Sequence, residues 1–166
     1  MNTNPTEVRH HILSVLVENK PGVLARVSGL FARRAYNIYS LAVAPTNDPS
    51  VSRISIVVDV ESAPLEQITK QLDKLINVLV IEELAPADAV QRELLIATVS
   101  VTTSGHDAFR STLGTFSAQV LQESGDSFIV SLEDTPERLD VFASFLGSHH
   151  LAAIERTGRV ALPRLG

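Results

Sequence analysis

The six residues Asn19-Lys20-Pro21-Gly22-Val23-Leu24 carry the clearest chemistry in the chain. They follow a run that alternates as a strand does and precede apolar residues at helical spacing, so they predict a turn from a strand into a helix. The first four N–H groups of a helix have no partner inside the helix, and the aligned peptide dipoles place partial positive charge there. Such a turn can bind an anion such as a carboxylate.

Three residue types in this turn suit a free amino acid as the ligand. Gly22 has no Cβ, so a ligand can approach the backbone closely. Pro21 fixes its own φ and stiffens the turn. Asn19 has an amide oxygen that can accept from an ammonium group and an NH₂ that can donate to a carboxylate. The alternative reading is a helix start at which nothing binds.

The composition narrows the class of protein. The chain has 166 residues, 45% of them apolar, which fits one domain or two small ones. Fourteen Lys and Arg are scattered among nineteen Asp and Glu, giving a net charge of −5, so we expect no nucleic-acid partner. The chain has no cysteine and hence no disulfide or thiolate site. No apolar run reaches about 18 residues and the first ten residues are polar, so we expect neither a membrane span nor a secretory signal, and a cytoplasmic location.

The first half of the chain alternates between strand and helix patterns. Apolar residues at helical spacing, Leu24, Val27, Leu30 and Phe31, predict the buried stripe of the first helix. The expected elements are a strand at 10–17, a helix at 23–34, strands at 38–44 and 51–59, a helix at 65–75 and a strand at 78–84. This order predicts a ferredoxin-like βαββαβ domain, an antiparallel sheet with two helices on one face.

The second half repeats the same order of elements. The expected elements are a strand at 93–102, a helix at 106–116, a hairpin at 119–122 and 127–132, a helix from 135 to 146 and a short strand at 151–155. We therefore predict an α+β protein of two ferredoxin-like domains, residues 1–84 and 85–166, divided at the proline-containing segment 85–89. The start of the second half's first helix, Thr103-Ser104-Gly105, is generic, so we place the ligand-binding turn in the first half alone.

Other polar residues give weaker signals. The pairs His10-His11 and His149-His150 have no carboxylate or cysteine at ligand spacing beside them, and adjacent residues of a strand point to opposite faces, so we expect no metal site. No serine lies in a recognisable nucleophile motif, so we expect no catalytic residue.

The turn and four further motifs together resemble a known family, that of ACT domains. The motifs are Gly29-Leu30-Phe31, Tyr36-Asn37-Ile38, Leu41-Ala42-Val43-Ala44-Pro45-Thr46 and Ile154-Glu155-Arg156-Thr157-Gly158. More narrowly, they resemble the small, regulatory subunit of acetohydroxyacid synthase (acetolactate synthase), over nearly the whole chain. The chain departs from the family at Lys20-Pro21, where many relatives have acidic or serine residues, and over much of the second half.

The resemblance implies a non-catalytic chain that binds a separate large subunit, raises its activity and confers feedback inhibition by a branched-chain amino acid, usually valine. Thiamine diphosphate and magnesium, with FAD as a further candidate, would lie on the large subunit and none on this chain. The effector would bind where the ACT domains of a homodimer meet, contacting Asn19, Lys20, Pro21, Gly22, Val23 and Leu24 together with Asn37 and Ile38. Two alternatives are a free-standing ACT-type amino-acid sensor and an acylphosphatase-like enzyme, although the latter would need an arginine where Lys20 and Pro21 stand.

Overall fold

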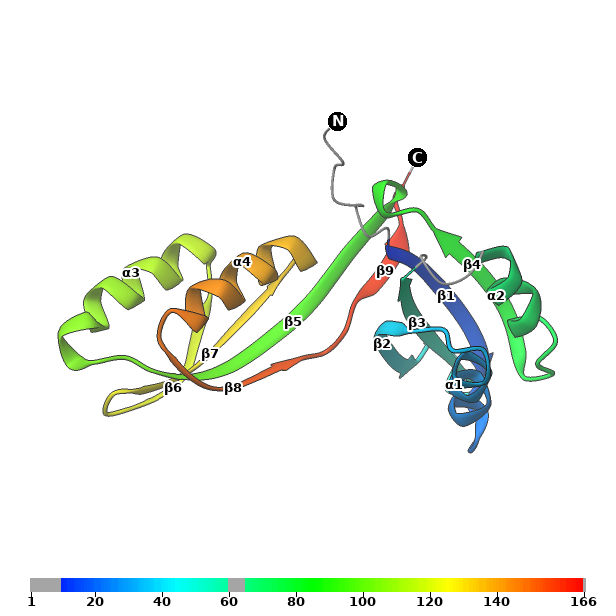
Figure 1. The fold of residues 1–166 in the computed structure, drawn as a ribbon, viewed down its shortest axis with the longest axis horizontal. Coiled ribbons are helices and arrows are strands. Elements are labelled where there is room, and N and C mark those ends of the chain that lie inside the picture. Colours follow the sequence, from blue (N-terminus) through cyan, green and yellow to red (C-terminus); the bar gives the residue numbers. More distant parts are fainter. Residues whose placement is uncertain (1–9, 60–64, 166) are drawn as a thin grey trace. The chain divides into compact units, whose positions relative to one another are not determined.

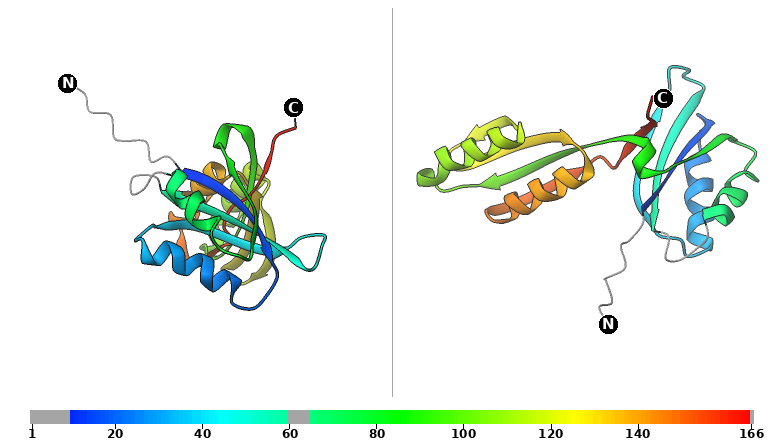
Figure 2. Two further views of the ribbon diagram at one scale, coloured as in Figure 1. Left: turned by 90° about the vertical axis from the view of Figure 1, so that its right-hand side faces the viewer. Right: turned by 90° about the horizontal axis from the view of Figure 1, so that it is seen from above.

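The computed structural model describes residues 10–59 and 65–165, which form two units. The first unit contains the described residues up to Val90 together with those from Arg159 onward, and the second is Gln91–Gly158. Each has its own sheet, pair of helices and core (Figures 1 and 2). In the described part of the chain, no helix has the length and apolar character needed to cross a membrane.

The first unit is built around a four-stranded antiparallel sheet with the strand order β2-β3-β1-β4. Its elements are β1 His10–Glu18, α1 Val23–Arg33, β2 Ile38–Pro45, β3 Val51–Asp59, α2 Leu65–Leu72 and β4 Val78–Leu84. Strands β2 and β4 therefore form the two edges of the sheet. The element order is the βαββαβ order that the sequence predicts.

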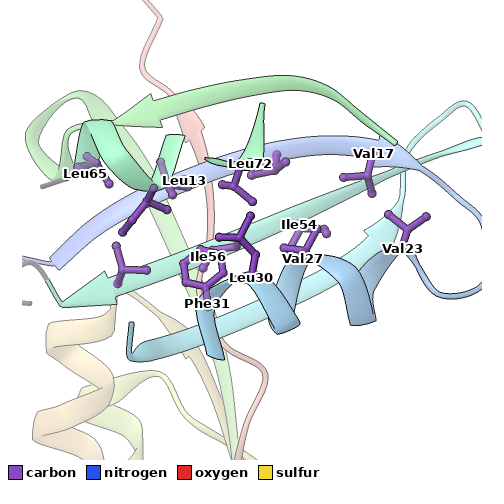
Figure 3. Packing of buried hydrophobic residues seen from close by; sticks show 13 residues of the cluster. Leu13, Val17, Val23, Val27, Leu30, Phe31, Ile54, Ile56, Leu65 and Leu72 are labelled. Atoms are coloured by element: carbon purple, nitrogen blue, oxygen red, sulfur yellow. The ribbon is translucent and has the colours of Figure 1, made fainter. Parts of the chain in front are cut away.

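The core of the first unit lies between the sheet and its two helices (Figure 3). Strand residues that alternate along β1 and β3, such as Leu13, Val15 and Ile56, meet apolar residues of α1 and α2. The predicted stripe of α1 was wrong at one position, because Val23 is buried and Leu24 is 42% exposed. Val23 is the residue that lies one turn before Val27, whereas Leu24 is rotated by about 100° from that line.

Residues from two later segments of the chain, around Ala89 and Ala161, cover part of the opposite face of this sheet. Ile12 and Val57 alternate with core residues, so they face away from the helices, and they pack with Leu84, Ala89 and Ala161. Ala89 opens β5 (Ala89–Ser100), and Ala161 lies in β9 (Val160–Pro163), which pairs with β5. The first compact unit therefore extends to Val90 and includes the described residues from Arg159 onward, because these small side chains are buried against its sheet.

The second unit has the sheet order β6-β7-β5-β8. Its remaining elements are α3 His106–Phe116, β6 Gln119–Ser124, β7 Ser127–Asp134, α4 Pro136–Gly147 and β8 His150–Arg156. The core consists of alternate residues of β5 and β7 packed against both helices, and Phe109, Phe128 and Phe142 are its largest members. Two ferredoxin-like units in one α+β chain confirm the predicted fold class.

A buried ion pair joins the end of β8 to β5 in the second unit. Arg156 of β8 donates two hydrogen bonds to the Glu93 carboxylate, at 3.0 and 2.7 Å, and one to Asp140 of α4 at 2.7 Å. The bonds to Glu93, followed by those to Asp140, raise the pKa of the Arg156 guanidinium above its usual value. The Glu93 side chain is only 5% exposed, so it depends on Arg156 to compensate its charge.

We expect Arg156→Ala to lower the free energy of unfolding by about 2 to 3 kcal/mol, because it leaves a buried carboxylate unpaired. Chemical denaturation followed by far-ultraviolet circular dichroism measures this loss. Arg92→Ala is the matched control, because the Arg92–Glu133 pair on the same sheet is exposed at 48% and 60% and should contribute less than about 1 kcal/mol. Equal losses in both variants would contradict the role given to the Glu93–Arg156 pair.

One member of each histidine pair has close side-chain neighbours in the structure. His11 Nδ1 is 3.0 Å from Glu83 Oε1, and His149 packs edge-on against Phe109 and Phe145. No cluster of three metal-ligating side chains occurs within residues 10–59 and 65–165.

Candidate functional site

The turn before α1 has an open backbone. Gly22 is the N-cap of α1 with φ 83° and ψ −9°, and no side chain of the described residues caps the helix. A Cβ built on Gly22 would meet no atom within 4 Å, so the space beside it is open. The first amide of the helix, Val23 N–H, makes only a long bond of 3.3 Å to Lys20 O. The helix start thus offers backbone donors and partial positive charge to a ligand, as the sequence predicts.

Hydrogen bonds on the sheet side hold this turn in place. The Asn19 N–H donates to Ser50 O at 2.7 Å, and its side-chain nitrogen donates to Pro49 O at 2.9 Å. The Glu18 N–H donates to Asn77 O at 2.9 Å. The turn is therefore a rigid connection, and the Asn19 amide oxygen is the atom of that side chain best placed by chemistry to accept from an ammonium group.

A charged network that was not predicted from the sequence flanks the turn. Arg26 Nη1 donates to Asn77 Oδ1 at 2.7 Å, and Asn77 Nδ2 donates to Glu18 at 2.5 Å. Lys20 Nζ lies 3.1 Å from the other oxygen of Glu18. The hydrogen bond from Asn77, followed by that from Lys20, lowers the pKa of the Glu18 carboxyl below its usual value. Arg26 follows Gly22 by one helical turn, so its position beside the turn could have been predicted from the sequence. Asn77 comes from the loop before β4, and no local pattern predicts that it lies there.

The apolar residues of the predicted site divide into two groups. Val23 is 4% exposed and packs in the core, so its side chain presents little surface at the turn. Leu24 is 42% exposed beside the turn, and Ile38 is half-buried at the start of β2. Among the three branched aliphatic residues of the predicted site, Leu24 and Ile38 are therefore the two that present apolar surface.

The two parts of the predicted site lie at opposite ends of α1. The turn precedes Val23, while Asn37 and Ile38 follow the end of the helix, and Figure 3 shows Val23 and Phe31 well apart along it. Eleven helical residues span about 16 Å, which is too far for one small amino acid to bridge. One chain thus does not bring Gly22 and Asn37 together. Asn37 is exposed, and it precedes the edge strand β2, which has no strand on its outer side among the described residues.

An open groove of about 230 Å³ lies elsewhere in the first unit, between α2 and β4. It is lined by Thr69, Lys70, Asp73, Val78, Leu79, Val80 and Ile81. None of the residues predicted to bind an effector belongs to it.

Comparisons with known proteins match both halves of the chain. Residues 13–80 match the family model of the AHAS small subunit-like ACT domain, and residues 92–165 match the model of the small subunit of acetolactate synthase. The acetolactate synthase small subunit of Mycolicibacterium smegmatis is 44% identical over 163 residues, covering 98% of this chain and 94% of that protein. The acetolactate synthase isozyme 3 small subunit of Escherichia coli is 40% identical over 154 residues, covering 92% and 94%.

A solved structure agrees with these matches. The acetolactate synthase small subunit of Thermotoga maritima superimposes with a TM-score of 0.87 at 32% identity, covering 96% of this chain and 99% of that one. The resemblance carried by the turn, the Tyr36-Asn37-Ile38 segment and the C-terminal Glu-Arg-Thr-Gly motif is thereby confirmed over both units. This chain belongs to the family of acetolactate synthase small subunits and carries the ACT domain of that family in its first half.

Proposed function

We propose that this chain is a non-catalytic regulatory subunit that binds the large subunit of acetolactate synthase, raises its activity and confers feedback inhibition by valine. The observation that supports this most strongly is the uncapped, glycine-opened start of α1 in a chain of this family. The reaction would take place in the cytoplasm on the large subunit, which would hold thiamine diphosphate, magnesium and any FAD. The role of this chain would be to bind the effector and to change the state of that enzyme.

The effector pocket requires three kinds of contact, and the first unit has groups for each. Backbone N–H groups after Gly22 would hold the carboxylate at the positive end of α1. The side-chain oxygens of Asn19 and Asn37 would accept from the ammonium group. The exposed side chain of Leu24 and the half-buried side chain of Ile38 would contact the aliphatic part. One methylene is worth about 1–3 kcal/mol in such a pocket, so we expect valine, leucine and isoleucine to bind with graded strength.

We propose that the pocket is completed by a second copy of this chain. Gly22 and Asn37 lie at opposite ends of α1, so the turn of one chain must meet the β2 start of another if both contact one ligand. The edge position of β2 leaves that strand open to a partner. A ligand shared in this way stabilises one arrangement of the homodimer, and a typical coupling of 1–3 kcal/mol is enough to change the activity of a bound enzyme severalfold.

We propose that the second unit contacts the large subunit. This unit has a complete core, but its first helix lacks the open glycine turn, since Gly105 has φ −97° and precedes α3 within a 3-10 turn. A well-packed unit without ligand chemistry is suited to protein contact.

Acetolactate formation by the large subunit tests the proposed function directly. Purified large subunit is assayed with and without this chain, and the complex is titrated with valine, leucine and isoleucine. The proposal requires higher activity with the chain present and inhibition by at least one of the three. No co-purification and no stimulation would instead favour a free-standing amino-acid sensor.

We expect Asn37→Ala to raise the valine concentration for half-inhibition about tenfold while stimulation of the large subunit is retained. The reason is the loss of one hydrogen bond to a charged group, worth about 1.5 kcal/mol or more. Asn37→Asp is the matched variant, because it has the same shape and still accepts from an ammonium group, so it should keep valine inhibition. Unchanged inhibition in Asn37→Ala would remove this residue from the pocket.

A further inference from the structure

Arg159 is a buried arginine at the point where the chain re-enters the first unit. It is 7% exposed, and its Nε is buried and has no hydrogen-bond partner among the described residues. Its backbone N–H donates to Ser40 Oγ at 2.8 Å, and its guanidinium carbon lies 5.2 Å from the centre of the Tyr39 ring. Both partners belong to β2, directly after Asn37 and Ile38. The C-terminal segment is thus attached to the strand whose start is the proposed effector contact.

The residues just before Arg159 are fixed to the second unit. Thr157 N–H donates to Leu94 O at 3.1 Å, and Leu94 N–H donates to Thr157 Oγ1 at 3.1 Å. Arg156 is held by Glu93 through two hydrogen bonds. Gly158, with φ 84°, is therefore the one residue between a position fixed on β5 of the second unit and a position fixed on β2 of the first. Two peptide units therefore join Thr157 to the Arg159 N–H that donates to Ser40.

Strand β2 has an irregularity at this place. Ile38 pairs with Val58 and Ser40 pairs with Val57, so Tyr39 is an extra residue in the ladder. A bulge of this kind leaves one residue unpaired with the neighbouring strand and bends the edge of the sheet. Tyr39 is held instead by ring contacts, with His10 at a centroid distance of 4.2 Å and Arg159 on the ring. The start of β2 is therefore held by fewer ladder hydrogen bonds than a regular strand, and Arg159 contacts it at that place.

We propose that Arg159 is the coupling residue of regulation: it carries the occupancy of the effector site at the β2 start, through Tyr39 and Ser40, to the end of β8 in the second unit. This inference rests on the proposed function of Asn37 and Ile38 as effector contacts. It assigns a role to three residues that are outside the effector pocket, and it explains why the C-terminal segment after Gly158 returns to the first unit.

The test separates effector binding from effector response. Arg159→Ala removes the guanidinium from Tyr39, and Ser40→Ala removes the acceptor for the Arg159 N–H with the loss of a single oxygen atom. Arg164→Ala is the matched control, because Arg164 lies at the same chain end but donates to Ala87 O, at 3.1 Å, away from β2. For each chain, valine binding is measured by calorimetry on the small subunit alone, and stimulation and valine inhibition are measured in the complex with the large subunit.

We expect Arg159→Ala and Ser40→Ala to bind valine within about threefold of wild type and to stimulate normally, while the valine concentration for half-inhibition rises tenfold or more, within the range of typical couplings. Arg164→Ala should behave as wild type. Hydrogen exchange gives a readout without the large subunit: valine should change the exchange of the Thr157 amide in the wild-type chain and not in Ser40→Ala.

Each failure has a distinct meaning. A wild-type chain that gives no heat with valine, leucine or isoleucine contradicts the proposed function itself. Normal valine binding with normal inhibition in both variants overturns the coupling role while leaving the pocket intact. Loss of valine binding in parallel with loss of inhibition also overturns it, because Arg159 would then belong to the pocket. If Arg159→Ala does not fold, Ser40→Ala alone decides between these outcomes.

Discussion

Gly22→Asp should abolish valine inhibition while stimulation of the large subunit survives. The new carboxylate would stand in the open space beside the start of α1, where the ligand's own carboxylate is proposed to bind. The aspartate carboxylate would repel the carboxylate of valine, and the new side chain would occupy the space proposed for the ligand. We therefore expect the valine concentration for half-inhibition to rise at least a hundredfold, which corresponds to about 3 kcal/mol of binding free energy. The measurement is a valine titration of acetolactate formation by the reconstituted complex.

Gly22→Asn separates charge from volume and strain. Asparagine and aspartate have the same shape, and both tolerate the left-handed backbone of Gly22 better than other residues do. Both should therefore lose about 1 kcal/mol of stability and fill the same space. We expect Gly22→Asn to raise the half-inhibiting concentration about tenfold, well short of the aspartate variant. If the two variants behave alike, the turn does not bind a carboxylate; if both lose stimulation as well, its role is structural.

The order of elements could be predicted from the sequence because local patterns determine it. Alternating apolar residues predict β1 and β3, and apolar residues at helical spacing predict α1, α3 and α4. Each pattern is long enough to predict its element without knowledge of the residues that it packs against. The local pattern did not determine that Leu24 is exposed and Val23 is buried. Two adjacent apolar residues at a helix start allow two phases, and the packing of Val23 against the sheet decides between them.

The burial of Ala89, Ala161 and Glu93 could not be predicted, because it depends on residues far away in the sequence. Ala89 and Ala161 are small, lie in short or irregular patterns, and become core residues only through Ile12 and Val57. Glu93 is a charged residue in a strand, and its burial follows from an arginine 63 positions away. No local propensity contains this information, since these contacts exist only in the folded chain.

The candidate site shows the same division. The chemistry of the glycine turn was readable, because a left-handed glycine before a helix exposes donors whatever the rest of the fold does. The predicted helix at 23–34 already separated that turn from Asn37, whereas the hydrogen bonds that join Asn77 to Arg26 and Glu18 could not be predicted from spacing. The structure places the turn and Asn37 at opposite ends of the helix, and this separation makes the pocket's two-chain composition testable.

Mixed dimers should recover valine inhibition when the two site defects are placed on different chains. If each pocket takes its turn from one chain and its β2 start from the other, a dimer of one Gly22→Asp chain and one Asn37→Ala chain contains one pocket with both defects and one with neither. The two chains carry different affinity tags, the mixed dimer is isolated through both tags, and its valine titration in complex with the large subunit is compared with those of the two parent dimers. We expect inhibition at a near-wild-type valine concentration, where the Gly22→Asp parent shows none.

The reciprocal dimer is the control that decides the geometry. One chain carrying both Gly22→Asp and Asn37→Ala is paired with a wild-type chain, so that the total number of substitutions is unchanged. A two-chain pocket then leaves one defect in each pocket, and inhibition should stay weak. A pocket formed within one chain predicts the opposite, because the wild-type chain would keep an intact site. Recovery in the reciprocal dimer and not in the mixed one would therefore refute the shared pocket, and it would require Gly22 and Asn37 to act in the same chain despite the length of α1 between them.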